Sequence, residues 1–167
     1  MIKQLVFIKR ATSTASNAAL RAAEIELGFP LPRAFIEFCQ TYNGGIPADQ
    51  NRFYSVPRSY REFHREYRSS HAGVSVTGLL GLPGDAKGCN CLRVYKRLRE
   101  WSRIESLPIG EDLFGNHVVV LSQEPEKTVF WVDHELWIGP EEPMLFPIAE
   151  TLEDFYNGLG ASSSGSA

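Results

Sequence analysis

The chain has 167 residues, of which 43% are hydrophobic and 22% are charged, and its formal net charge is −3. These values are typical of a globular protein and argue against a disordered chain. No apolar run approaches the ~20 residues that cross a bilayer. The N-terminal apolar run, residues 5–8, is too short for the core of a signal peptide, so we expect a cytoplasmic protein that is not bound to a membrane.

Charge is unevenly spread along the chain. Residues 1–45 carry a net charge of +2, residues 46–104 carry +6, and residues 105–167 carry −11. An asymmetry of this kind concerns the partners of a protein more than its fold. Two interpretations stay open: the acidic part faces a basic partner, or the segments interleave in space and their charges balance.

The N-terminal part predicts a strand around residues 5–8 and then two helices. Ser16 is a suitable N-cap for a helix over 17–27, and Gly28 suits the left-handed position that ends it. Pro32 suits the first turn of a second helix, over 32–42. This second helix has an aromatic stripe at helical spacing: Phe35, Phe38, Cys39 and Tyr42.

The middle of the chain predicts helix, strand and helix. Pro57 opens a helix to residue 68, which has an aromatic side made of Tyr60, Phe63, His64 and Tyr67. A strand over 74–82 follows, interrupted by two glycines, and Pro83-Gly84-Asp85 makes a turn. Residues 92–104 predict a basic helix.

The C-terminal third predicts sheet. Strands over 117–122 and 128–132 form a hairpin that is buried on both faces, and further strands cover 135–139 and 144–148. Thr151 caps a last helix, with a stripe made of Leu152, Phe155, Tyr156 and Leu159. Helices around an antiparallel sheet make the chain α+β, in one domain over residues 1–159, with a flexible Gly/Ser tail over 160–167.

The cysteines favour neither a disulfide framework nor a metal site. Three cysteines in a chain with no export signal argue against disulfides. Cys39 lies on an apolar helical stripe and is expected in the core. Cys89 and Cys91 form a Cys-x-Cys pair, but a closed zinc site needs two more ligands. We therefore expect no metal and no other cofactor.

Two blocks of residues resemble a known family. The first is Glu24-x-x-Leu27-Gly28-x-x-Leu31-Pro32-x-x-Phe35-x-x-Phe38-x-x-x-Tyr42-Asn43-Gly44-Gly45. The second contains Leu107-Pro108-Ile109, Gly115-Asn116, Val129-x-Trp131-x-Asp133-His134-Glu135 and Ile148-Ala149-x-Thr151-Leu152-x-x-Phe155. Their order and spacing resemble the SUKH superfamily, the Smi/Knr-like domain, over residues 24–45 and 107–159.

The resemblance implies an α+β fold and, in bacterial members, an immunity protein. Such a protein binds and neutralises a polymorphic toxin, commonly a nuclease or a deaminase. Other members are regulatory or scaffold proteins, and this remains the alternative function. The resemblance carries no catalytic residues with it, so we expect the protein not to be an enzyme.

The most enzyme-like string is Asp133-His134-Glu135. In a strand, neighbouring side chains point to opposite faces, so Asp133 and Glu135 share a face while His134 points away from them. The three groups therefore converge only if the strand turns there. A structural role at a strand end is favoured over the alternative, a small hydrolase.

Two sets of charged residues are candidates for contact with a partner. The first follows one side of the predicted helix 57–68 and consists of Arg58, Arg61, Arg65 and Arg68. Glu62 and Glu66 can pair with these arginines, so an ordinary solvated helical face is favoured over a protein-partner surface, and a nucleic-acid partner is the least favoured. The second set falls in predicted turns, hence on the surface. It forms either ordinary solvated loops or the candidate surface for a cognate toxin with a basic cleft: Glu111, Asp112, Glu124, Glu126, Glu141 and Glu142.

Overall fold

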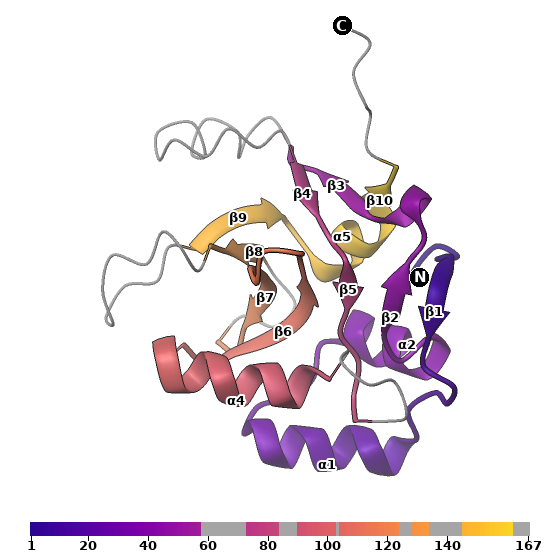
Figure 1. Ribbon diagram of the computed structural model, residues 1–167. Coiled ribbons are helices and arrows are strands. Elements are labelled where there is room, and N and C mark those ends of the chain that lie inside the picture. The colour runs from indigo at the N-terminus through magenta and orange to yellow at the C-terminus, as the bar shows by residue number, and fades with distance from the viewer. Residues whose placement is uncertain (58–72, 84–89, 103, 124–127, 134–144, 162–167) are drawn as a thin grey trace, which may run out of the picture.

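The computed structural model describes residues 1–57, 73–83, 90–102, 104–123, 128–133 and 145–161 (Figure 1). The helices in these ranges are α1 (Asn17–Leu27), α2 (Arg33–Thr41), the short 3-10 helix η1 (Asp49–Asn51), α4 (Cys91–Ser102) and α5 (Leu152–Gly158). The predicted helix over 57–68, apart from its first residue, and the whole predicted strand over 135–139 lie outside the described ranges.

The described residues form two antiparallel sheets, which together with the helices confirms the predicted α+β class. The seven-stranded sheet has the order β1-β2-β5-β6-β7-β8-β9, and the three-stranded sheet has the order β10-β3-β4. The strands of the large sheet are β1 (Phe7–Arg10), β2 (Gly45–Pro47), β5 (Gly78–Leu79), β6 (Ser106–Glu111), β7 (His117–Leu121), β8 (Val129–Val132) and β9 (Leu145–Ala149). Those of the small sheet are β3 (Phe53–Ser55), β4 (Gly73–Ser75) and β10 (Leu159–Gly160).

The ends of the predicted helices are confirmed where a local cap determines them. Ser16 Oγ accepts a hydrogen bond from the Ala19 N–H, 3.2 Å away, at the start of α1, and Gly28 ends the helix at φ 82°. Thr151 Oγ1 accepts one from the Asp154 N–H at 3.1 Å at the start of α5. Pro32 lies at the N-cap of α2, just before the first turn in which it was predicted.

The predicted interrupted strand over 74–82 is confirmed only in part, because the chain changes its pairing partner before Gly78, the first of the two glycines. The Val76 N–H still donates to Arg52 O, next to β3, at 2.7 Å. The Thr77 N–H already donates to Glu111 O, in β6, at 2.8 Å. The segment therefore forms two short strands, β4 and β5, which belong to different sheets.

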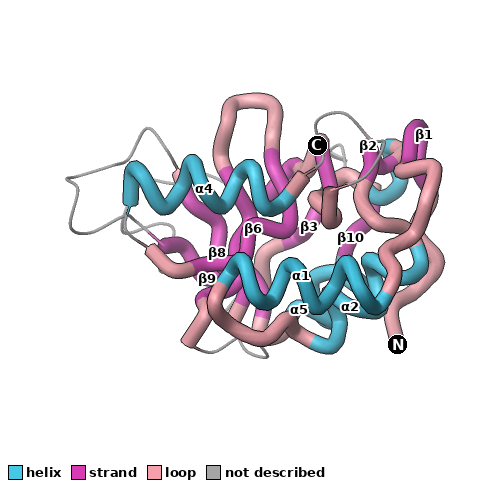
Figure 2. Tube along the Cα trace, turned by 90° about the horizontal axis from the view of Figure 1, so that it is seen from below, coloured by secondary structure: helices cyan, strands magenta, loops and turns pink. Residues whose placement is uncertain are grey.

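The helices α1 and α4 lie side by side next to the large sheet (Figure 2). The Tyr95 hydroxyl of α4 donates to Leu27 O of α1 at 3.2 Å, and Lys96 Nζ lies 2.6 Å from Glu26 Oε1. Elsewhere in the core, Phe38 of α2 stacks on Tyr156 of α5 with ring centroids 4.8 Å apart. Among the described residues, no helix combines the length and the apolar character that a membrane crossing requires.

Candidate partner-binding surface

The Asn-Gly-Gly motif after α2 is structural. Asn43 is buried at φ 54°, its Oδ1 accepts from the Leu82 N–H at 2.9 Å, and its Nδ2 donates to Ser13 O at 3.3 Å. Gly45 lies so close to β1 that a methyl group on it would be 2.4 Å from Lys9 O. These residues therefore join the end of α2 to segments distant in sequence and are not free to contact a partner.

Other residues of the two motif blocks also serve the fold. Glu24 Oε1 accepts a hydrogen bond from the Leu31 N–H at 3.0 Å, which fixes the loop between α1 and α2. Ile109 and Trp131 are buried in the sheet, and Gly115 turns the chain at φ 91°. These motif residues therefore stabilise the fold, and the residues that contact a partner are other ones.

The basic face of α4 is largely engaged with the rest of the chain. Lys96 pairs with Glu26, and Arg99 Nε lies 3.1 Å from Glu105 Oε1. Arg97 Nη2 lies 3.2 Å from His117 Nε2. These contacts connect α4 to α1 and to the segment that enters β6, although Lys96 and Arg99 remain more than half exposed. The arginine series Arg58, Arg61, Arg65 and Arg68 lies outside the described residues.

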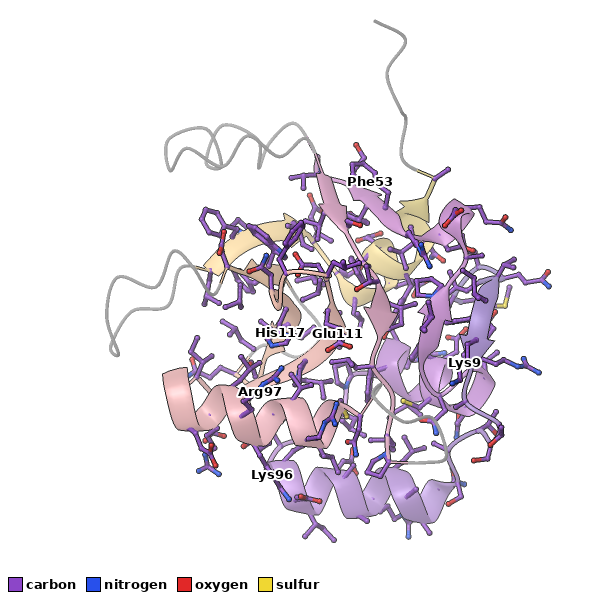
Figure 3. The ribbon with its side chains drawn as sticks, viewed as in Figure 1. Lys9, Phe53, Lys96, Arg97, Glu111 and His117 are labelled. Atoms are coloured by element: carbon purple, nitrogen blue, oxygen red, sulfur yellow. The ribbon has the colours of Figure 1, made fainter. Side chains whose placement is uncertain are left out.

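A half-buried polar cluster lies between α4 and the end of the β6–β7 pair. Glu111 pairs with His117 across the two strands, and His117 is only 2% exposed. Figure 3 shows the side chains of Arg97, Glu111 and His117 directed toward one another. A guanidinium can only donate, so a hydrogen bond between Arg97 and His117 requires His117 Nε2 to be the acceptor.

The prediction that Glu111 lies in an exposed turn is wrong. It is the last residue of β6 and is half-buried, because its strand register turns the side chain toward α4. Burial raises the pKa of Glu111, while attraction by Arg97 and Arg93 acts in the opposite direction. As a contact for a partner, Glu111 is thus less accessible than the sequence indicates.

Asp112 organises the turn between β6 and β7. Its Oδ1 accepts from the N–H groups of Phe114 and Asn116 at 2.8 and 2.9 Å, and its Oδ2 accepts from Asn116 Nδ2 at 2.8 Å. The Asp112 N–H in turn donates to Asn116 O at 3.1 Å. The tip of this turn displays Leu113 and Phe114, which are 78% and 77% exposed.

Sequence reasoning missed this pair of apolar side chains. The available signal was a pair of large hydrophobic residues, Leu113 and Phe114, between a turn-forming aspartate and a glycine. The sequence places both Glu111 and Asp112 in a turn, but only Asp112 lies in one, because β6 continues to Glu111.

The remaining acidic candidates, Glu124, Glu126, Glu141 and Glu142, lie outside the described residues. The strand ends before and after residues 124–127 are Leu121 of β7 and Val129 of β8, where Val129 pairs with Val120. The strand ends before and after residues 134–144 are Val132 of β8 and Leu145 of β9, which pair with each other. Val132 also pairs with His117, at the other end of β7.

Only part of the enzyme-like string and of the cysteine set lies in the described residues. Asp133 directly follows β8, and His134 and Glu135 lie outside the described residues. In the described part of the chain, no three His, Cys, Asp or Glu side chains gather where they could hold a metal ion. Cys39 is buried in the core as predicted, and Cys91 is buried as well, while Cys89 is not described.

Comparison with protein-family models shows the family of the chain. The family model described as the SMI1 / KNR4 family (SUKH-1) matches residues 14–158, which contain both motif blocks and all four α-helices described above. A search of curated proteins found no match.

Proposed function

The chain belongs to the SMI1 / KNR4 family (SUKH-1), and from this premise we propose that it is an immunity protein. It binds a cognate polymorphic toxin, a nuclease or a deaminase, and neutralises it by forming a one-to-one complex. The observation that carries the proposal is the family match over residues 14–158.

The geometry of the described residues supports an action through the surface. Asn43 and Glu24, two of the polar residues in the motif blocks, are engaged in hydrogen bonds inside the fold. Because these polar side chains are occupied inside the fold, they are not the ones that act on another molecule. We therefore propose that the protein acts through exposed side chains that bind a partner. We place the protein in the cytoplasm, where a toxin that attacks nucleic acid or nucleotides would have to be met.

We further propose that the acidic turn residues contribute to the contact. This set consists of Asp112, Glu124, Glu126, Glu141 and Glu142. Glu111 belongs to it as well, with a half-buried side chain. Carboxylates around an interface attract a basic cleft over long range, which speeds encounter and helps to select the partner.

Co-expression tests the proposal. Each toxin encoded near this gene is expressed in a sensitive host with and without the chain, and rescue from one particular toxin is the expected result. Purified chain is then titrated against that toxin, and inhibition should be complete at one equivalent. Rescue from none would favour the alternative, a regulatory or scaffold protein, and neutralisation at far below one equivalent would indicate catalysis.

A further inference from the structure

The turn between β6 and β7 presents two large apolar side chains to solvent at the same place. Leu113 and Phe114 are 78% and 77% exposed, and they are neighbours in the chain. Single exposed hydrophobic residues are common on protein surfaces and need no explanation. Two adjacent ones at the tip of a turn form a projecting apolar contact, and aromatic residues are enriched in the buried centres of protein interfaces.

This tip is held in one conformation before any partner arrives. Both carboxylate oxygens of Asp112 accept hydrogen bonds within the turn, and Gly115 adopts the left-handed conformation at φ 91°. The turn closes the β6–β7 pair, whose ladder runs from Ser106 to Glu111 in the interior of the large sheet. An anchor that is already ordered loses little conformational entropy on binding.

The charges near the tip indicate what kind of partner fits. Asp112 begins the turn, and Asp133 follows Val132, which pairs with His117 at the same end of the sheet. The half-buried Glu111 lies beside them, but its charge is attracted by Arg97 and Arg93 of α4. Carboxylates beside an apolar anchor favour a protein pocket with a basic rim. They disfavour an anionic lipid surface, which attracts cationic segments.

We propose that Leu113 and Phe114 are the apolar anchor that this chain inserts into a pocket on the toxin it neutralises. This inference rests on the proposed function and adds to it the position of the contact. The negative charge of the turn, from Asp112 at its start and Asp133 at the same end of the sheet, then lies next to the basic rim of that pocket.

The test uses the full chain and the purified toxin that the rescue assay identifies. A double variant, Leu113→Ser with Phe114→Ser, should bind this toxin at least about 30-fold more weakly than wild type, as expected for the loss of an interface hot spot. Its melting temperature should stay at the wild-type value, because both side chains are exposed. The matched control is Ile25→Ser in α1, which removes a side chain that is 83% exposed and should leave the affinity unchanged.

The outcomes separate the inference from the proposed function. A double variant that binds the toxin as tightly as wild type overturns the anchor and leaves the immunity function standing. A wild-type chain that neutralises none of the neighbouring toxins overturns the proposed function, and the anchor with it. Sedimentation with vesicles of phosphatidylglycerol and phosphatidylcholine that the double variant abolishes would assign the tip to a membrane and also overturn the inference.

Discussion

The side-chain Oδ1 of Asn43 accepts a hydrogen bond of 2.9 Å from the backbone N–H of Leu82. The two residues are 39 positions apart, and both are buried. This bond ties the turn after α2 to the segment that follows β5. It gives the asparagine of the family motif a physical role in the assembly of the sheet.

Asn43→Ala should lower the free energy of unfolding by about 2 to 4 kcal/mol. The variant leaves the buried Leu82 N–H without its acceptor and places a Cβ-bearing residue with no local hydrogen bond at φ 54°. Asn43→Gly removes only the hydrogen bonds and should be intermediate. Urea denaturation of the three proteins at a common slope checks this order, and an alanine variant as stable as wild type would refute it.

Gly81 and Gly28 separate steric from conformational requirements. A methyl group on Gly81 would lie 2.3 Å from the backbone of Asn43, whereas one on Gly28 meets nothing within 4 Å but is strained at φ 82°. We expect Gly28→Ala to cost about 1 kcal/mol of stability. Gly81→Ala should cost several times more, because backbone atoms must move. Thermal unfolding followed by circular dichroism compares the two, and equal losses would contradict the close approach.

Glu111→Gln should stabilise the protein at neutral pH. Burial raises the pKa of Glu111, so the folded state holds the ionised form less favourably than the unfolded state does. Above the raised pKa the wild type bears this cost and the glutamine variant does not. Below the unfolded pKa both states are protonated, and the difference should vanish. Urea denaturation at several pH values between 3 and 8 measures the gap, and a gap that widens as pH falls would show the opposite sign.

The thiols of Cys39 and Cys91 should be unreactive in the folded protein. Burial raises the pKa of Cys91 to about 12 and that of Cys39 well above its ordinary value. With a pKa of 12, only about one thiol in ten thousand is ionised at pH 8. In a Cys89→Ser background, a thiol reagent should therefore modify neither residue until urea is added, when both react. Rapid modification without urea would mean that one of these thiols is accessible.

Association with the toxin should depend on salt. If the acidic turn residues face a basic cleft, the association rate should fall about tenfold as the Debye length shrinks from about 30 Å at 0.01 M to about 8 Å at 0.15 M salt. The dissociation rate should change much less, because it depends on short-range contacts such as the proposed anchor. Stopped-flow mixing measures both rates, and an association rate independent of salt would remove the acidic surface from the proposal.

Local signals predicted the helices well and one surface feature poorly. Ser16, Gly28 and Thr151 mark helix ends through contacts within a few residues, and the structure has these ends where the pattern places them. The sequence predicted a turn at Asp112, but it did not predict that Leu113 and Phe114 would be exposed there. Their exposure follows from the hydrogen bonds of Asp112, which hold the turn in a shape that directs both side chains to solvent.

The amino-acid pattern by itself determined both ends of α1, the start of α5, the α+β class and the family, because caps, apolar stripes and motif spacing are properties of neighbouring residues. The tertiary structure alone decided that the chain between 74 and 82 divides between two sheets and that Glu111 is half-buried. Both depend on a partner 34 residues away: the Thr77 hydroxyl and N–H donate to Glu111 O. Strand pairing and burial arise from contacts between distant segments, and such contacts leave no local trace in the sequence.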